Sequence, residues 1–354
     1  MTAAARIALA GRQVLEGRML RRDELLSLAQ AASTEPCELM HWAGLVRRKH
    51  FGNRVSFCSI IPGKLGGCGE DCKWCAQSLV HKGAESQPPH PPGIDPTAPP
   101  GLKKKSTRTP LAEIRSAAAR AAENRAGCFC IVNSGRRPGK RDLAEVADAC
   151  RQLHADGLTT GGMRISASLG EIDAESARQL AQAGVRRYNH NLETSRRHYA
   201  SVVSTHTYDD RLATLQAARQ AGMQLCCGGI FGIGETWEDR IDLALTLRDE
   251  VRPAISPLNF LHPIAGTPLE HATPLAPMEI LTIIAIFRLA LPATDLKIAG
   301  GRVHNLRDMQ GWIFHAGATS CLAGNYLTTQ GRDLREDIQM VQDLGLELVP
   351  DVSA

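Results

Sequence analysis

The chain has 354 residues, of which 43% are hydrophobic and 22% are charged, so it can bury a large core and is not intrinsically disordered. Its 41 Lys and Arg against 37 Asp and Glu leave a formal net charge of +4. A charge this small gives no argument for a nucleic-acid or membrane partner, and a small-molecule substrate is expected. The 11 cysteines, an odd number in a long chain, favour free thiols in a reducing cytoplasm over disulfides.

The N-terminal residues are predicted to form helices rather than a targeting or membrane segment. Arg6 and the apolar patch 7–10 lack the apolar length of a signal peptide. No later stretch approaches the roughly 18 uninterrupted apolar residues of a membrane span. Residues 1–50 are therefore predicted to be a helical extension. Its expected helices cover residues 13–20, 22–31 and 37–49.

Three cysteines with C-x3-C-x2-C spacing, Cys68, Cys72 and Cys75, follow an apolar, strand-like run at residues 55–61. Three such thiolates can hold three irons of a cubane [4Fe-4S] cluster and leave the fourth iron open to a small molecule. Structural zinc is the main alternative, but it needs a closed tetrahedral set, and no fourth Cys or His lies within five residues of the triplet. A chance group of buried thiols is a further alternative. The spacing favours the cluster with one open iron.

Seven prolines lie between residues 87 and 102, just before the basic run 103–105. Because proline at this density is incompatible with a helix or an inner strand, an exposed insertion is predicted at about residues 83–107. A solvated loop is the simpler interpretation, and a functional lid or partner-binding tail is the alternative.

From residue 111 onward, helical patterns alternate with short apolar strands. The expected helices are 111–124, 141–155, 172–183, 208–221, 236–250, 277–290 and 306–315. The expected strands are 55–61, 128–133, 163–168, 185–191, 223–231, 254–261, 295–299 and 319–322. This alternation requires parallel pairing through right-handed crossovers, and eight units match a closed (β/α)8 TIM-type barrel. The barrel is assigned to residues 51–345, followed by a tail at 346–354; an open doubly wound sheet is the alternative fold.

In such a barrel, functional residues gather at the C-terminal ends of the strands. The cysteine loop follows the first strand, as this rule requires. Polar or small residues also end other strands, at 133–135, 189–193, 228–229 and Asn259. These segments are expected to share one rim with the cysteines.

Five motifs, in this order along the chain, resemble those of the biotin synthases, a family of radical S-adenosylmethionine (SAM) enzymes. They are GCGEDCKWCAQS (67–78), YNHNLETS (188–195), GGIFGIGET (228–236), GTPL (266–269) and LTT (327–329). The match runs from about residue 50 to 345. The cysteine triplet alone occurs in many radical enzymes, whereas five motifs at barrel spacing are specific.

The resemblance implies a [4Fe-4S] cluster on Cys68, Cys72 and Cys75, whose open iron takes the amino and carboxylate groups of SAM. It also implies that a 5'-deoxyadenosyl radical removes hydrogens from dethiobiotin and that a second, auxiliary iron–sulfur cluster supplies the sulfur of biotin. An electron donor such as flavodoxin or ferredoxin and a homodimeric state are implied as well.

Site roles are implied by the same resemblance. Asn191 and Glu193 would hold the ribose and amino-acid parts of SAM, and Trp74 would pack over the cluster. Glu193 stands where the family usually has Asp, so its hydroxyl contacts are expected to shift by one methylene. The implied substrate residues are Asn189, Asn191 and Asn259 for the cyclic urea, and Ser320, Thr328 and Thr329, after the last strand, for the carboxylate. Amide side chains suit a urea because each offers a donor and an acceptor, although any of these residues could instead form a turn.

The auxiliary site departs from the family pattern, which uses three cysteines and one arginine. Cys130 and Cys226 match two of the cysteines, but Ser166 stands at the third position and Lys297 at that of the arginine. The usual [2Fe-2S] ligand set is therefore incomplete, and the sequence leaves the type of auxiliary cluster open.

Two additional thiols, Cys128 and Cys227, lie beside the matched ones. Because side chains on a strand alternate between its faces, Cys128 shares the face of Cys130, whereas Cys227 faces away from Cys226. The predicted auxiliary ligands are Cys128, Cys130 and Cys226. The remaining cysteines are interpreted as ordinary buried thiols: Cys37, Cys58, Cys150 and Cys321.

Two other functions are considered. A radical SAM relative without sulfur insertion, of the hydrogenase-maturation or pyrrolysine-pathway type, is favoured by the incomplete auxiliary site and opposed by the asparagines. A non-catalytic metal-binding or scaffold protein is opposed by the polar rim.

Overall fold

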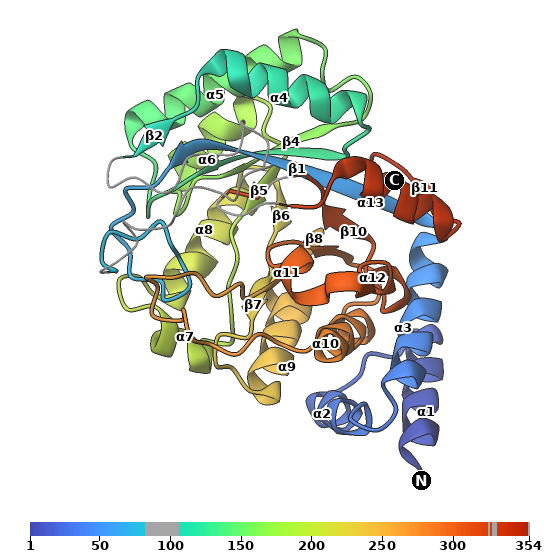
Figure 1. Ribbon diagram of the computed structural model, residues 1–354. Coiled ribbons are helices and arrows are strands. Elements are labelled where there is room, and N and C mark those ends of the chain that lie inside the picture. The colour runs from blue at the N-terminus through green and yellow to red at the C-terminus, as the bar shows by residue number, and fades with distance from the viewer. Residues whose placement is uncertain (82–105, 325, 328–330, 353–354) are drawn as a thin grey trace.

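The computed structural model describes residues 1–81, 106–324, 326–327 and 331–352. Most of the proline-rich insertion, together with Thr328 and Thr329, lies outside the described residues. Figure 1 shows a barrel of strands surrounded by helices, with the N-terminal helices to one side, next to α10 (Pro277–Ala290).

Eight parallel strands close the barrel, which confirms the predicted TIM-type fold. The closing pair is β1 with β10, in which Ser56 is paired with Ser320. An open doubly wound sheet has no such pair, so that alternative is wrong. The barrel strands, in spatial order, are β1 (Arg54–Leu65), β3 (Cys128–Asn133), β4 (Arg164–Ser168), β5 (Arg187–Asn189), β6 (Gln224–Cys226), β8 (Ile255–Phe260), β9 (Asp295–Ile298) and β10 (Ser320–Leu322).

Short strands extend this sheet. β7 (Gly229–Phe231) continues the line of β6 and pairs with β8. β2 (Thr107–Arg108) is antiparallel to the end of β1, and β11 (Glu347–Leu348) is parallel to its start. Part of the C-terminal tail is therefore a strand that covers the beginning of β1.

The helices of the barrel follow the expected rhythm with a few differences. They are α4 (Leu111–Glu123), α5 (Lys140–Ala155), α6 (Ala174–Gln182), α7 (Arg196–Val202), α8 (Tyr208–Gln220), α9 (Trp237–Thr246), α10, α11 (Arg302–Leu306), α12 (Trp312–His315) and α13 (Leu334–Asp343). The expected helix 306–315 is wrong, because the chain breaks at Arg307, whose φ is 48°, and forms α11 and α12 instead. The short α7 and the terminal α13 were not expected.

The N-terminal extension consists of α1 (Ala3–Leu15), α2 (Arg22–Ala31) and α3 (Pro36–Phe51). The expected helix at 13–20 is wrong. The hydroxyl of Thr2 accepts a hydrogen bond from the Ala5 N–H at 3.2 Å and starts α1 early, and Gly17, with a φ of 95°, follows its end. α3 packs against both α1 and α10, so the extension is joined to the barrel through α10.

α10 is the most deeply buried helix of this layer, because all its residues from Ile280 to Ala290 are buried. The barrel lies on one side of it and α3 on another. Its apolar sequence on all faces is typical of a helix with no solvent face.

A fully buried ion pair attaches α13 to the barrel. The guanidinium of Arg302, which begins α11 after β9, pairs with the carboxylate of Asp337 on α13, and both side chains have no exposed surface. Breaking such a pair leaves one charge without compensation in the interior.

We predict that Asp337→Ala lowers the free energy of unfolding by about 3–5 kcal/mol, because it leaves the Arg302 charge buried. Its neighbour Glu336, which pairs with Arg332 on the surface, is the matched control. Glu336→Ala should change stability by less than about 0.5 kcal/mol in the same urea titration. Equal changes in the free energy of unfolding for the two variants would contradict a stabilising role of the Arg302–Asp337 pair.

Candidate active site

A cavity of about 280 Å³ lies at the C-terminal ends of the strands, where a barrel places its active site. Its walls include Cys68, Cys72 and Cys75, together with Asn189 and Asn191. Residues from the cysteine loop and from the ends of β3, β4 and β5 therefore meet around one space, as the rim prediction requires for 133–135 and 189–193. Residues 228–229 and Asn259 of the predicted rim are not among the residues that line this cavity.

A larger cavity, of about 730 Å³, lies at the opposite end of the barrel between α3, α12 and the segment after α13. Its only cysteine among the described residues is Cys37, which is exposed, so the prediction that Cys37 is buried is wrong. The smaller cavity is the candidate site because it holds the cysteine triplet.

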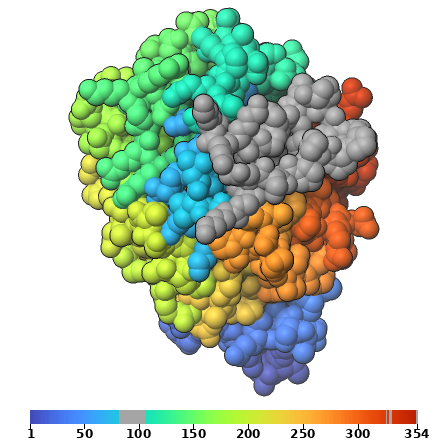
Figure 2. All heavy atoms as spheres, turned by 60° about the vertical axis from the view of Figure 1, so that its left-hand side comes forward, coloured from blue at the N-terminus to red at the C-terminus, as the bar shows by residue number. Residues whose placement is uncertain are grey.

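The backbone of the cysteine loop is held in a compact fold. The Cys68 N–H donates to the Gln77 carbonyl at 3.1 Å, and the Cys68 carbonyl accepts from the Leu79 N–H at 2.7 Å. The Cys75 N–H donates to the Cys72 carbonyl at 2.9 Å. Figure 2 shows this loop, in light blue, at the surface of the molecule.

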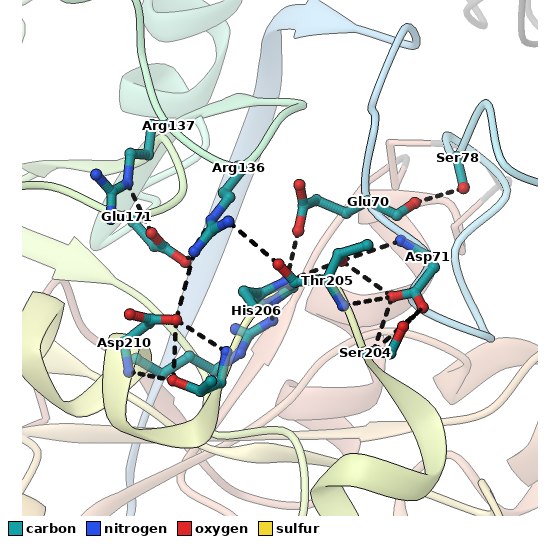
Figure 3. A network of polar contacts seen from close by, with 12 residues as sticks. Glu70, Asp71, Ser78, Arg136, Arg137, Glu171, Ser204, Thr205, His206 and Asp210 are labelled. Carbon is teal, nitrogen blue, oxygen red and sulfur yellow. Dashed lines mark hydrogen bonds and ion pairs between the residues drawn. The ribbon is translucent and has the colours of Figure 1, made fainter.

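Two acidic residues between the cysteines attach the loop to the segment after α7 (Figure 3). Asp71 accepts hydrogen bonds from the backbone N–H groups of Ser204 and Thr205, at 3.0 and 3.2 Å, and from both hydroxyls. Glu70 lies 2.6 Å from the Nδ1 atom of His206. These contacts join residues more than 130 positions apart in the chain.

Arginines on the neighbouring loop extend this network. Arg136 donates to Glu171 at 3.1 Å and to the Thr205 carbonyl at 3.1 Å, and it pairs with Asp210. Arg137 also pairs with Glu171. The loop after β3 and the loop after β4 are thereby tied to the same segment that holds the cysteine loop (Figure 3).

The three thiols of the triplet influence one another. Burial raises the pKa of Cys75 to about 11, and the neighbouring Cys68 adds to this shift. Burial also raises the pKa of Cys72 and of Cys68. No three His, Cys, Asp or Glu side chains in the described part of the chain stand close enough to bind one single ion. A cubane fits this arrangement better than zinc, because its three cysteines bind three different irons.

Several buried polar atoms in the cavity have no partner among the described residues. They are Asn133 Oδ1, Asn189 Oδ1, His190 Nε2 and Glu193 Oε2. Buried polar atoms are almost always hydrogen-bonded, so this set indicates a polar ligand. The amine, carboxylate and ribose hydroxyls of SAM offer both donors and acceptors of this kind, so the residues present fit SAM.

Arg211 of α8 is a site residue that sequence reasoning missed. Its buried guanidinium donates to the Tyr199 hydroxyl at 2.6 Å and to the Asn191 carbonyl at 2.8 Å, and it lies 3.7 Å from the Glu193 carboxylate. Burial raises the pKa of Glu193, which has a φ of 69°. No sequence pattern separates Arg211 from Arg219, the other arginine of α8, because only tertiary packing buries Arg211.

The three predicted SAM residues do not all line the cavity. Asn191 and Glu193 line the cavity, and the Asn191 side-chain oxygen accepts from the Gly228 N–H at 3.1 Å. Trp74 is half-buried and packs against the hydrophobic core.

The predicted substrate residues are only partly brought together. Asn189 lines the cavity and its amide donates to the Cys130 sulfur at 3.2 Å. Asn259 lies on β8, where it donates to the Gly229 carbonyl at 3.0 Å and accepts from the Gly300 N–H at 2.8 Å. These contacts leave Asn259 with one free N–H and one free lone pair.

Ser320 does not follow the last strand. It is the first residue of β10, is buried, and donates its hydroxyl proton to Asp295 at 2.7 Å. The expectation that it lies after the last strand is therefore wrong. Ser320 falls inside the strand expected at 319–322 and is paired with Ser56 near the start of β1, toward the start of the barrel strands.

The barrel interior holds a group of buried thiols next to this cavity. Cys128, Cys130 and Cys226 are all buried, and Cys128 lies 3.1 Å from the Ser166 hydroxyl. The Lys297 ammonium lies 3.6 Å from the sulfur of Cys226 and 3.6 Å from that of Cys58. Cys58, which is buried as expected, thus lies beside this group. Cys227, directly after the end of β6, instead packs in the hydrophobic core.

Comparisons with known proteins agree with this geometry. Residues 64–247 match the Radical SAM superfamily, and residues 257–347 match the Biotin and Thiamin Synthesis associated domain. A biotin synthase of Trichlorobacter lovleyi is 41% identical over 96% of this chain and 95% of its own length. One of Syntrophotalea carbinolica is 42% identical over 94% of this chain and 95% of its own length. The chain belongs to the biotin synthase family.

Solved structures of other radical enzymes share the fold. Methylornithine synthase has a TM-score of 0.76 at 21% identity and covers 96% of this chain and 97% of its own. The [FeFe]-hydrogenase maturase HydG has a TM-score of 0.78 at 15% identity, over 98% of this chain and 75% of its own. At such identities the likeness concerns the fold alone, so a function of either type is not favoured over that of the biotin synthase family. In the described part of the chain, no helix has the length and apolar character needed to cross a membrane.

We predict that Asp71→Ala speeds the loss of iron from the reconstituted triplet by at least about tenfold, as expected for an outer contact of a metal site. The substitution removes the hydrogen bonds that attach the loop to Ser204 and Thr205. Iron release to a chelator, followed by absorbance, measures this rate. Asp209→Ala, which removes an exposed carboxylate of α8 paired with Arg196, is the control and should release iron as the unmodified protein does. Equal rates for both variants would argue against an anchoring role of Asp71.

Proposed function

We propose that this member of the biotin synthase family inserts sulfur into dethiobiotin to form biotin, with SAM as its source of radicals. The observation that carries the proposal is the position of Asn189. This side chain lines the cavity of the cysteine triplet and also contacts Cys130 in the barrel interior. A substrate held there would lie between a SAM site and a set of buried thiols, which is the arrangement that sulfur insertion requires.

Cys68, Cys72 and Cys75 are the proposed ligands of the [4Fe-4S] cluster. When bound, this cluster would supply the electron for cleavage of SAM, which is the source of the radical that would remove hydrogen from dethiobiotin. The surrounding barrel contributes a closed environment that keeps water away from the reacting carbons.

Asn191 and Glu193 are proposed to bind SAM through their side chains, and Trp74 to shield the loop by packing. The free Oε2 atom of Glu193 supports this role, since it is buried without a partner among the described residues. The Arg211 guanidinium beside Glu193 would keep this carboxylate oriented.

Asn189, Asn191 and Asn259 are proposed to bind the cyclic urea of dethiobiotin. The unpaired Oδ1 atom of Asn189 can accept from a urea N–H, and the free amide proton of Asn259 can donate to a urea oxygen. Thr328 and Thr329 are proposed to bind the substrate carboxylate on the resemblance alone. Ser320 is left out of this set because its hydroxyl donates to Asp295.

Cys128, Cys130 and Cys226 are proposed as ligands of the auxiliary iron–sulfur cluster that provides the sulfur. Their burial in one barrel interior supports the proposal, as does the hydrogen bond between Ser166 and Cys128. By family resemblance we further propose that flavodoxin or ferredoxin supplies the electron, that the protein is a cytoplasmic homodimer, and that it needs no nucleic-acid or membrane partner.

We predict that the anaerobically reconstituted protein converts dethiobiotin to biotin when SAM and a reductant are present. Mass spectrometry detects the gain of sulfur, and omission of SAM is the control. Consumption of dethiobiotin without a sulfur-containing product would favour a radical enzyme that lacks sulfur insertion. If SAM is cleaved but dethiobiotin is not consumed, the enzyme acts on another substrate.

We also predict that Cys72→Ala abolishes the formation of 5'-deoxyadenosine, because the open-iron cluster needs all three thiolates. Chromatography of the reaction mixture measures this product. Cys150→Ala removes a buried thiol of the outer helix α5 and should retain SAM cleavage. Continued cleavage by the Cys72 variant would refute the assignment of the triplet.

A further inference from the structure

Cys58 stands beside the auxiliary thiols, although no sequence pattern groups it with them. It lies on β1, where its backbone is paired with that of Cys128 on β3. Cys58 and Cys128 also pack together in a small interior cluster with Tyr326. Strand pairing and side-chain packing thus both place Cys58 next to one of the auxiliary thiols.

Strand register explains why these thiols converge. Paired residues on adjacent strands point to the same face, and residues two apart on one strand share that face about 6–7 Å along it. Cys58 and Cys128 are paired, and Cys130 is two residues beyond Cys128. Cys226, on the far side of the ring, is paired with Asn189, whose amide contacts Cys130.

Lys297 connects the two sides of this group. Its Nζ atom is 3.6 Å from both Cys58 Sγ and Cys226 Sγ, so it bridges strands β1 and β6. A protonated ammonium has no lone pair for a metal and acts only as a donor. Arg187 is a second buried cation near Cys128 and Cys226.

We propose that Cys58 is a fourth thiolate ligand of the auxiliary cluster, with Cys128, Cys130 and Cys226, and that Lys297 is a charge-compensating donor rather than a ligand. This proposal rests on the proposed function, since it concerns the cluster that function requires. Four thiolates complete a cluster site without the arginine of the usual set. The two buried cations offset the negative charge that four thiolates bring into the interior.

The ligand set is tested in a parent protein in which Cys68, Cys72 and Cys75 are all replaced by Ala, so that any bound cluster is the auxiliary one. The full-length parent is reconstituted with iron and sulfide, and its iron, its sulfide and the electron paramagnetic resonance of the reduced state are measured. Cys58→Ala should lose most of the iron and sulfide. Cys150→Ala, the matched control for loss of a buried thiol, should retain both.

Two further variants distinguish a role of Cys58 as a cluster ligand from a role in packing alone. Cys58→Ser keeps nearly the same volume and should fold, which circular dichroism checks, but its resonance should differ from that of the parent. Lys297→Met should retain the iron and lower the reduction potential, because it removes a positive charge beside the cluster. A Cys58→Ser protein with unchanged iron and resonance overturns the proposal, as does loss of iron in Lys297→Met with retention in Cys58→Ala.

The outcome is distinguishable from failure of the proposed function. Production of 5'-deoxyadenosine and biotin by the unmodified protein tests that function without reference to Cys58. Iron bound by the parent tests the auxiliary site without reference to activity. A parent that takes up no iron overturns the ligand proposal even if SAM cleavage by the unmodified protein is intact.

Discussion

The pairing of β1 with both β3 and β10 is the constraint on which the rest of the structure depends. It closes the sheet, so every strand must direct alternate side chains into one interior. It also places the loop after β1 beside the loops after β3, β4 and β5. The cysteine triplet and the polar side chains of the cavity meet for this reason, although more than 110 residues separate Cys75 from Asn189.

Two buried cations, Arg211 and Lys297, organise the side chains around them. Arg211 is buried, and it is stabilised by the Tyr199 hydroxyl, the Asn191 carbonyl and the Glu193 carboxylate. In the interior, Lys297 is surrounded by thiols. Burial alone would lower the pKa of Lys297, but the neighbouring Cys226 and Cys58 outweigh it and raise this pKa above its usual value. Both cations are compatible with the interior only because anionic or polarisable partners accompany them.

The two halves of the site differ in how closely they follow the family. The side of the site that contains the cysteine triplet, Asn191 and Glu193 resembles the family motifs. The difference there is the longer side chain of Glu193, which stands at a usual Asp position. On the auxiliary side, the resemblance places Ser166 at a cysteine position and Lys297 at the arginine position, and Cys128 is a proposed additional ligand. The two sides lie on different parts of the ring, and Asn189 contacts both of them.

The sequence by itself determined the order of strands and helices, since periodicity and strand-ending residues are local signals. It also determined the cysteine triplet and, through the two-residue period of a strand, the common face of Cys128 and Cys130. Boundaries such as the early start of α1 depended on a cap at Thr2, and the break at Arg307 depended on backbone conformation. Only the tertiary structure decided that Cys58 joins the auxiliary thiols, because its contact with Lys297 spans 239 residues and arises when the barrel closes.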